Sequence, residues 1–389
     1  MNILVVGCGL MGPAIAKDCA QNKEVTHVEG CDIDEEQLKR CLKIVSNNKF
    51  ETSILNLNNY EALVKKMKGF DVVVNASASQ FSLNILKASM EIGCNLVDLT
   101  SAHYPLEGEL YDEVKNANIT AIPGCGVDPG LIDILAGYGM DLMDEVEEVY
   151  FACGGLPLNP QPPLDYKIVF GGKRMPIRPG KVPVILNSAH VKVDRYSEVE
   201  PVHIEGFKDM EAFYDGYPSS LLSLCMEKGV KTFKGKTIRY KGFTDKLQLL
   251  IDLGIISEDI IIYQGHKIVP LDFFQELTYP KVRFDSGAGD RDITVLRVRV
   301  KGRKDDSFIC VMYEMVDFYD EKEKITSMAR TTGYTAAIIA RMLARGEISQ
   351  KGIQWPVGVI KGDLFKKLMI SLRKRGIDVT ETILKTEKL

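Results

Sequence analysis

Short apolar runs alternate with helical patterns over the first third of the chain. The apolar runs, which are rich in β-branched residues and predict strands, are 3–6, 25–31, 52–55, 71–75, 95–99 and 120–123. Near-continuous apolar runs are typical of parallel strands covered on both faces, and segments such as 14–19 between them repeat apolar residues at the helical period. The alternation predicts an α/β fold over residues 1–130, with a doubly wound parallel sheet of the Rossmann type.

The pattern changes after a helix that we expect to begin near Pro129. From about residue 148, Gly and Pro residues separate short segments. Residues 294–300 alternate apolar and charged positions, and an expected turn at 301–306 leads into the run 308–319. This pattern predicts a hairpin with one solvated face.

Residues 131–327 are therefore expected to form an inserted α+β substrate domain with a mixed or antiparallel sheet. Its covering helices are expected near 221–228 and 245–253. From Ser327 a helical pattern returns, and the charged tail after Thr380 is expected to fray. We expect the C-terminal helices to fold back, so that 328–389 joins 1–130 in one dinucleotide-binding domain.

The composition excludes several classes of partner. A length of 389 residues favours two domains. The net charge of −4 and the lack of a basic block provide no surface for nucleic acid. The N-terminus lacks a secretory signal, no apolar run has transmembrane length, and the cysteines show no metal-binding spacing. We expect a cytoplasmic protein with no structural metal, nucleic-acid partner or membrane segment.

A glycine-rich motif, Gly7-Cys-Gly9-Leu10-Met11-Gly12, follows the first predicted strand and opens a helix. In this context Gly7 permits the tight turn, Gly9 lets the backbone approach a diphosphate, and Gly12 lets helix and strand pack closely. The diphosphate would rest on free N–H groups at the helix N-terminus. We predict that these glycines, Leu10 and Met11 bind a dinucleotide.

An acid at the end of the second predicted strand, Asp32, favours NAD over NADP. Its carboxylate can accept hydrogen bonds from a ribose diol and would repel a 2′-phosphate. The next residues, 33–36, include no Arg that could hold that phosphate.

Two further strand ends contribute candidate cofactor contacts at the carboxyl edge of the sheet, where ligands of such folds bind. Asn75, Ala76 and Ser77 end the fourth strand, where a nicotinamide ribose would pass, although an ordinary strand end would look the same. Val127 belongs to the glycine-rich run 124–130 after the sixth strand.

Three residues at this edge are candidates for the chemistry. Asp128 precedes Pro129, which disfavours helical backbone, so its side chain could project and meet a substrate amine. Equally, Asp128 could simply cap a helix that has Pro129 at its first position. His103 and Tyr104, beyond the fifth strand, could move protons, although His103 could also be an ordinary exposed loop residue.

In the second domain, Tyr166, Thr237 and Arg239 combine aromatic and polar groups. Arg239 could hold a carboxylate through two parallel hydrogen bonds. An Arg in an alternating strand could instead belong to a solvated face.

Taken together, several segments resemble the saccharopine dehydrogenase-like family, and within it most closely the lysine 6-dehydrogenase branch. The segments that carry the resemblance, in chain order, are 7–12, 124–130, 154–157 (GGLP), 162–166 (PPLDY), 197–201 (SEVEP), 237–240 (TIRY) and 327–332 (SMARTT). The resemblance covers nearly the whole chain.

The resemblance implies NAD(P)-linked oxidation or formation of a C–N bond at an amino acid, a homodimer, and a substrate pocket that includes Asp128, Tyr166 and Arg239. The saccharopine-forming branch carries an Asn-Arg-Asp-Ser run where this chain has Pro-Ser-Ser at 218–220, and Gly-Tyr-Lys-Phe-Ser-Trp where it has Asp-Tyr-Lys-Ile-Val-Phe at 165–170. Loss of a pocket cation suits a substrate with one carboxylate better than one with three.

The expected activity is therefore NAD-dependent oxidative deamination of the ε-amino group of L-lysine. Its product, the 6-semialdehyde, can cyclise to piperideine-6-carboxylate. In this hypothesis Arg239 anchors the α-carboxylate, Asp128 takes a proton from the ε-ammonium, and His103 or Tyr104 moves protons during hydrolysis. The alternatives are a saccharopine or carboxynorspermidine reductase, and a non-catalytic NAD-sensing protein.

Overall fold

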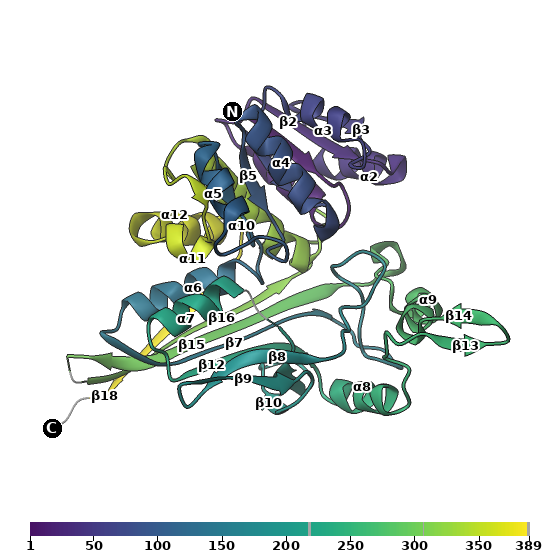
Figure 1. Ribbon diagram of the computed structural model, residues 1–389, viewed down its shortest axis with the longest axis vertical. Helices are drawn as coiled ribbons and strands as arrows, with labels where there is room; N and C mark the ends of the chain where they lie inside the picture. The colour runs from purple at the N-terminus through teal and green to yellow at the C-terminus, as the bar shows by residue number, and fades with distance from the viewer. Residues whose placement is uncertain (217–218, 306, 387–389) are drawn as a thin grey trace. The chain divides into compact units, whose positions relative to one another are not determined.

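The computed structural model describes residues 1–216, 219–305 and 307–386, which form two compact units (Figure 1). The first unit contains Met1–Leu142, 219–224 and Tyr319–Thr380, and the second contains the other described residues. Two residues of the sequence analysis lie outside the described residues. They are Pro218, in the Pro-Ser-Ser segment that differs from the saccharopine-forming branch, and Asp306, in the expected hairpin turn.

The first unit is built on a parallel sheet. Its elements are β1 Asn2–Val6, α1 Gly12–Gln21, β2 His27–Asp32, α2 Glu35–Val45, β3 Phe50–Ile54, α3 Tyr60–Met67, β4 Val72–Asn75, η1 Ser79–Phe81, α4 Ser82–Ile92, β5 Asn95–Asp98, α5 Glu109–Asn116, β6 Thr120–Ile122, α6 Leu131–Asp141, α10 Ser327–Ala344, β17 Gly352–Ile353, α11 Pro356–Val359 and α12 Gly362–Arg373. The strands pair in the order β17-β6-β5-β4-β1-β2-β3, each parallel to its neighbours. Every predicted strand overlaps an observed one, and the predicted Rossmann-type sheet is confirmed.

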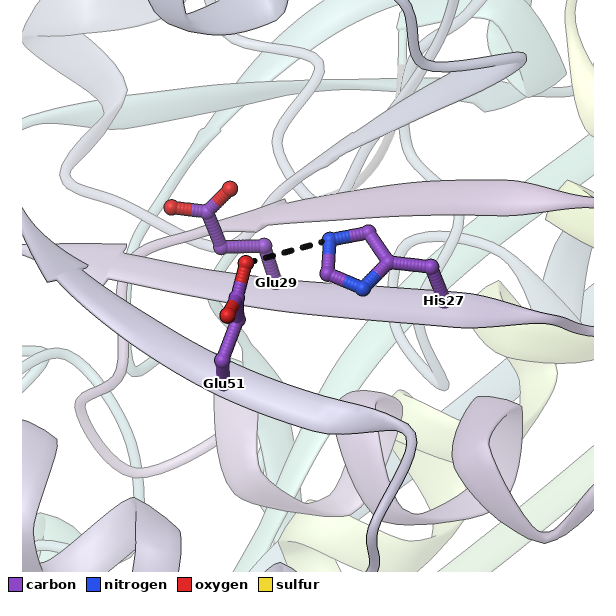
Figure 2. Close-up of side chains that lie close together, drawn as sticks. All are labelled: His27, Glu29 and Glu51. Carbon is purple, nitrogen blue, oxygen red and sulfur yellow. Dashed lines mark ion pairs between the residues drawn. The ribbon is translucent and has the colours of Figure 1, made fainter.

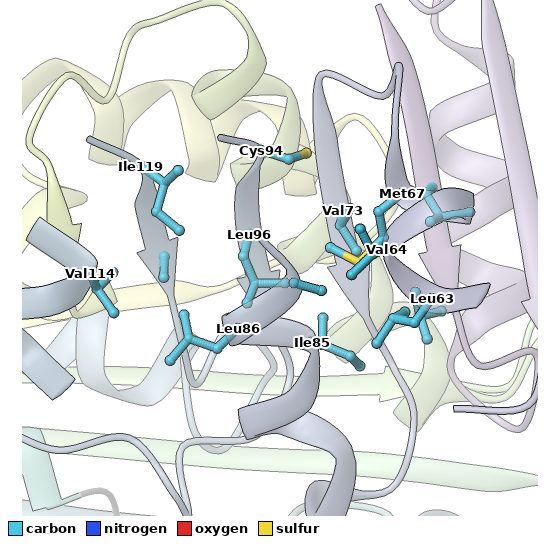
Figure 3. Close-up of a cluster of buried hydrophobic side chains, with 14 of the residues drawn as sticks. Leu63, Val64, Met67, Val73, Ile85, Leu86, Cys94, Leu96, Val114 and Ile119 are labelled. Atoms are coloured by element: carbon cyan, nitrogen blue, oxygen red, sulfur yellow. The ribbon is translucent and has the colours of Figure 1, made fainter. Parts of the chain in front are cut away.

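One face of this sheet is covered by α3, α4 and α5 (Figure 3). Leu63, Ile85 and Leu86 from the helices are fully buried against Val73 and Leu96 of β4 and β5. Strands covered in this way need apolar side chains at successive positions, which explains their near-continuous apolar runs.

The C-terminal segment returns to this unit through α10, which packs along α1. A Cβ atom at Gly333 would lie 2.9 Å from the Cβ atom of Ala14, so glycine allows the two helices to approach closely. Helix α6 also belongs to this unit, because Gly137 leaves room for Val357 of α11. The first unit therefore continues to Leu142, beyond the boundary at residue 130 that we expected from the sequence.

A buried ion cluster fixes the returning segment to α1. Asp18 of α1 is 5% exposed and forms ion pairs with Arg341 of α10, at 2.7 Å, and with Arg375 after α12. Buried charges are tolerated when they are paired, so the cluster holds three segments in one arrangement.

The second unit contains a mixed sheet. Its elements are β7 Glu145–Pro157, β8 Lys181–Leu186, β9 Ala189–Asp194, β10 Glu200–Val202, β11 Met210–Tyr214, α7 Ser219–Glu227 (of which 219–224 belong to the first unit), β12 Thr232–Tyr240, α8 Phe243–Asp252, β13 Ile261–Tyr263, β14 His266–Ile268, α9 Pro270–Val282, η2 Ser286–Ala288, β15 Asp292–Lys304, β16 Ser307–Phe318 and β18 Thr380–Thr386. The strand order is β10-β11-β12-β7-β15-β16-β18, with β8 joining β12 to β9. Strands β12 and β7 are parallel and β15 is antiparallel to both of its neighbours, which confirms the predicted second sheet.

The predicted hairpin corresponds to β15 and β16. Strand β15 extends into the expected turn at 301–306 and ends at Lys304, and β16 begins at Ser307. Arg297 faces Glu314 on the charged side, and their side chains lie 2.7 Å apart. Residues 380–386 do not fray as expected, because they form strand β18 beside β16. A strand at the edge of a sheet is held by backbone hydrogen bonds and can have mostly exposed side chains. The charged composition of this segment therefore did not predict strand β18.

Helices α8 and α9 share a second apolar cluster with the loop around Tyr166, and the hairpin β13–β14 extends beside α9 in Figure 1. Among the helices that can be described, none has the length and apolar character required to cross a bilayer.

We expect Arg341→Met to lower the free energy of unfolding of the first unit by about 3 kcal/mol, because Asp18 would keep a buried charge with only Arg375 to offset it. Urea unfolding followed by fluorescence measures this unit selectively, since Trp355 at the start of α11 is the only tryptophan in the chain. Lys39→Met, which removes an exposed pair with Glu36, is the control and should leave the free energy of unfolding almost unchanged. Equal losses for the two variants would contradict the structural role of the cluster.

Candidate functional site

The glycine-rich turn between β1 and α1 admits no side chain at two of its positions. A Cβ atom at Gly7, whose φ is +96°, would lie 2.8 Å from the Ala76 carbonyl, and one at Gly12 would lie 2.0 Å from the Gly7 oxygen. At Gly9, by contrast, nothing lies within 4 Å of the Cβ position. The backbone is therefore open to a ligand at Gly9, as a dinucleotide diphosphate requires.

Amide groups of the same turn are available to such a ligand. Within the described structure, the N–H groups of Leu10, Met11 and Gly12 donate no hydrogen bond, and Met11 caps α1 without a side-chain contact. Leu10 and Met11 are half-buried. Unsatisfied N–H groups at a helix N-terminus stabilise a phosphate, so the turn fits the diphosphate of a nicotinamide cofactor.

Asp32, at the end of β2, lies beside this turn. Its Oδ2 accepts a hydrogen bond from the Cys8 N–H at 2.7 Å, and its Oδ1 accepts one from the Asp34 N–H at 3.0 Å. The carboxylate is half-buried and each oxygen keeps a further lone pair, which a ribose hydroxyl could use.

Sequence reasoning missed Arg40. This exposed residue of α2 donates a hydrogen bond from Nη2 to the Gly9 carbonyl at 2.7 Å, so it places a cation beside the turn. It lies eight positions after Asp32 on a helix, and its approach to Gly9 depends on how α2 packs. Inspection of the residues directly after Asp32 could not reveal it.

At the ends of β4 and β5, two of the predicted site residues, Asn75 and Tyr104, are buried and form hydrogen bonds within the protein. Asn75 is fully buried and its amide reaches Asp98, Ser77 and Ser82, whereas Ala76 and Ser77 are half-buried. Tyr104 is buried and donates from its hydroxyl to Asp98 at 2.8 Å. Tyr104 therefore has its proton committed to Asp98 and is not placed as the mobile proton carrier that we considered.

The glycine-rich loop after β6 differs from the sequence-based alternatives. Helix α6 begins at Leu131, and Asp133 accepts a hydrogen bond from the Gly130 N–H at 3.1 Å. The interpretation of Asp128 as the helix cap, with Pro129 in the first turn, is therefore wrong. Asp128 is half-buried in the loop.

Two residues of this loop region are more buried than Asp128. Burial and the nearby charge of Asp128 raise the pKa of Asp133 well above its ordinary value. Val127 is 2% exposed. His103 is exposed, as the simpler interpretation expected.

In the second unit, the three predicted substrate residues lie in one group. Arg239 is 4% exposed, its guanidinium lies 4.8 Å from the centre of the Tyr166 ring, and it also faces Phe243 at 5.8 Å. Thr237, two positions earlier on β12, donates to Asp215 at 3.1 Å. Arg239 is therefore buried, and the alternative of a solvated strand face is wrong.

The charges of this group are unevenly balanced. Asp215 is neutralised by Arg195, at 2.7 Å, whereas among the described residues no carboxylate pairs with Arg239, whose guanidinium donates to the Ile238 carbonyl. The Tyr166 hydroxyl is buried without a hydrogen-bond partner in the same part of the structure. A buried cation beside an unsatisfied hydroxyl is an arrangement that an anionic ligand would complete.

A third group, His27, Glu29 and Glu51, lies on β2 and β3 (Figure 2). These residue types can bind metal ions. However, Glu29 pairs with Lys66 at 2.6 Å, and His27 lies at the start of β2, whereas the glycine-rich turn follows the end of β1. The group is separate from the nucleotide site.

Two family models match most of the chain. Residues 3–122 match the family described as the saccharopine dehydrogenase NADP binding domain, and residues 126–377 match the saccharopine dehydrogenase C-terminal domain. The chain is 23% identical to the carboxyaminopropylagmatine dehydrogenase of Synechocystis over 90% of its length and 91% of the relative. It is also 23% identical to the carboxynorspermidine synthase of Vibrio cholerae, over 98% and 97%.

Among solved structures, the apo saccharopine dehydrogenase of Saccharomyces cerevisiae that forms L-glutamate aligns over 98% of this chain and 99% of its own, with a TM-score of 0.82 and 19% identity. At this identity the likeness establishes the fold. The C-terminal match ends at residue 377 and thus includes the segment that returns to the first unit.

Alanine substitutions at Gly9 and Gly12 should have different effects, because the Cβ position is open at Gly9 and blocked at Gly12. Gly9→Ala should leave the unfolding transition unchanged, since the added methyl group meets no atom, yet weaken NADH binding about tenfold or more because the methyl occupies the space of the diphosphate. Gly12→Ala should disrupt both, because its methyl collides with the backbone of Gly7. Calorimetric titration with NADH, paired with urea unfolding, separates these outcomes. Unchanged NADH affinity in Gly9→Ala would place the cofactor elsewhere.

Proposed function

The chain belongs to the saccharopine dehydrogenase family, and from this premise we propose that it catalyses the NAD-dependent oxidative deamination of L-lysine at its ε-amino group. As a member of this family it is an oxidoreductase that uses a nicotinamide cofactor. The proposed products are the 6-semialdehyde, which can cyclise to piperideine-6-carboxylate, together with NADH and ammonia.

The observation that carries this proposal is the unpaired guanidinium of Arg239. A buried cation that lies beside aromatic rings and pairs with no acid of the described part of the chain is completed by one substrate carboxylate. The neighbouring cation, Arg195, is already neutralised by Asp215. Recognition by a single cation suits lysine, which has one carboxylate, better than saccharopine, which has three.

The choice of NAD over NADP rests on Asp32. Its carboxylate beside the turn suits a ribose diol and repels a 2′-phosphate. Arg40 acts in the opposite direction, because it is an exposed cation near Gly9. We propose NAD because the carboxylate is anchored by two backbone N–H groups, whereas Arg40 already uses its Nη2 on the Gly9 carbonyl.

In the proposed mechanism Arg239 binds the α-carboxylate, and Asp128 accepts a proton from the ε-ammonium so that the amine becomes neutral. A nicotinamide cofactor held at the glycine-rich turn would supply the acceptor for the hydride that leaves the ε-carbon. Water adds to the resulting imine and ammonia leaves, which balances lysine, NAD⁺ and water against semialdehyde, NADH, ammonium and one proton. The remaining candidate for moving protons during hydrolysis is the exposed His103.

A second candidate function is the reductive joining of an amine to a semialdehyde, as the names of the carboxynorspermidine and carboxyaminopropylagmatine relatives suggest. A third is NAD binding without turnover. We also propose, from the resemblance and the composition, that the protein is a cytoplasmic homodimer of this 43.4-kDa chain, which light scattering and cell fractionation can test.

We expect the protein to produce one ammonia per NADH from lysine and NAD⁺. Ornithine, diamines and saccharopine are tested in parallel as substrates, and NADP⁺ is tested as the alternative cofactor. NADH absorbance and a separate ammonia assay measure the two products. NADH oxidation with amine and semialdehyde, but no ammonia release, would favour the reductase. Cofactor binding without turnover on any amine would favour the sensing protein.

For Arg239→Leu we expect the lysine KM to rise about tenfold or more, because a charge-assisted contact to the substrate is lost, while NAD⁺ affinity stays unchanged. The matched control is Arg299→Leu, since Arg299 lies at the same 4.8 Å from a tyrosine ring, Tyr150, but is paired with Glu148. Arg299→Leu should leave the lysine KM unaltered. An unaltered KM in Arg239→Leu would remove Arg239 from the substrate pocket.

A further inference from the structure

The carboxylate of Asp98 collects hydrogen bonds from two segments at the carboxyl edge of the first sheet. Its Oδ2 accepts from the Asn75 amide and from the Tyr104 hydroxyl, each at 2.8 Å, and its Oδ1 accepts from the Thr100 N–H at 2.8 Å. The residue is 1% exposed. Both carboxylate oxygens of Asp98 act as acceptors in these hydrogen bonds, which a carboxylate satisfies and a neutral amide cannot.

Asn75 connects this carboxylate to the segment beside the glycine-rich turn. Because the amide NH₂ of Asn75 faces Asp98, its oxygen faces the other way and accepts from the Ser77 N–H at 3.0 Å and the Ser77 hydroxyl at 2.6 Å. The backbone of Ala76 and Ser77 in turn lies 2.8 Å from the Cβ position of Gly7. The orientation of the buried Asn75 amide therefore fixes the position of Ala76 and Ser77, which contact the glycine-rich turn.

The loop that carries Asp128 is joined to the same residue. The backbone oxygen of Asp98 accepts from the Cys125 N–H at 2.9 Å, and the Gly124 N–H donates to the Thr100 carbonyl at 3.0 Å. Asp98 thereby links the ends of β4, β5 and β6, although its own side chain is buried.

We propose that Asp98 is a positioning residue for the nicotinamide cofactor: its carboxylate fixes the Asn75 amide and thereby holds Ala76 and Ser77 against the glycine-rich turn. The inference rests on the proposed function insofar as that turn binds the cofactor. Neither the glycine motif nor the resemblance assigns a role to Asp98.

The protonation state of Asp98 gives the proposal its readout. Burial raises the pKa of Asp98 to about 6, although the hydrogen bonds from Asn75, Thr100 and Tyr104 oppose the shift. The titratable groups that face it are Tyr104 and Cys125, and burial raises the pKa of both well above their ordinary values, so both stay neutral near pH 6. Ser82 and Asn75 are its other polar neighbours and carry no charge.

Stability and cofactor affinity should then change in opposite directions with pH. Because the folded pKa lies above the unfolded value, the contribution of Asp98 to folding is fully present below pH 3.8 and is lost as the pH rises through about 6. NADH affinity should instead rise over the upper part of this range, because the ionised carboxylate orients Asn75. A residue with only a structural role would change both quantities in the same direction.

For Asp98→Asn at pH 7.5 we expect NADH affinity to fall about tenfold, since a single amide oxygen cannot serve donors on both sides. The rise in affinity near pH 6 should disappear. The reciprocal exchange, Asn75→Asp with Asp98→Asn, should recover part of the affinity, because an acid at position 75 accepts from both Ser77 and the new amide.

Glu29→Gln is the matched control, since Glu29 is a buried acid of the same sheet and its partner, Lys66, lies away from the turn. It should leave the NADH affinity and its pH profile unchanged. Calorimetric titrations between about pH 5 and pH 8, with unfolding of each variant measured at the same pH, provide the data.

Wild-type affinity that stays flat through pH 6 would overturn the inference, even if Asp98→Asn does not fold. An Asp98→Asn variant that binds NADH like the wild type would also overturn it. If the wild-type protein binds neither NADH nor NADPH, the proposed function itself fails, so the two failures are distinguishable.

Discussion

The first unit depends on an approach of backbone to backbone that leaves no space for a side chain. At Gly12 a Cβ atom would overlap the carbonyl of Gly7, and at Gly130 it would lie 2.3 Å from the carbonyl of Gly126. Both contacts lie in loops that follow parallel strands, where the chain must reverse sharply before a helix begins. Glycine is needed at these positions for steric reasons, and the open backbone at Gly9 is a consequence of the same turn.

The two units use buried charge in different ways. In the first unit Asp18 is neutralised by two arginines and holds the returning C-terminal helices on α1. In the second unit Arg239 lies among aromatic rings, and no acid among the described residues pairs with it. A paired buried charge contributes to a fixed arrangement. An unpaired buried charge destabilises the protein without a ligand, and the binding of an anion removes this cost. This contrast distinguishes the candidate recognition residue from the structural ion cluster.

Much of the fold could be predicted from the sequence because it depends on local patterns. Buried parallel strands read as apolar runs, and the glycine turn and Asp32 have fixed spacings. The frayed tail was a wrong prediction, since β18 is held by backbone pairing with β16, which side-chain composition does not report.

The polar part of the site was less predictable, because it depends on contacts between distant segments. The sequence places Asp98 within a predicted strand and offers Tyr104 as a residue that could move protons, and neither prediction shows that the two side chains contact each other. Arg40 reaches Gly9 only because α2 packs beside the turn. Each side chain had a recognisable type, but its partner was set by tertiary packing.

The most direct test of the account is a crystal structure of the protein grown with NADH. We expect the diphosphate on the N–H groups of Leu10, Met11 and Gly12, with a ribose hydroxyl donating to Asp32. A diphosphate bound elsewhere, or a glycine-rich turn covered by side chains in the presence of saturating NADH, would contradict the account.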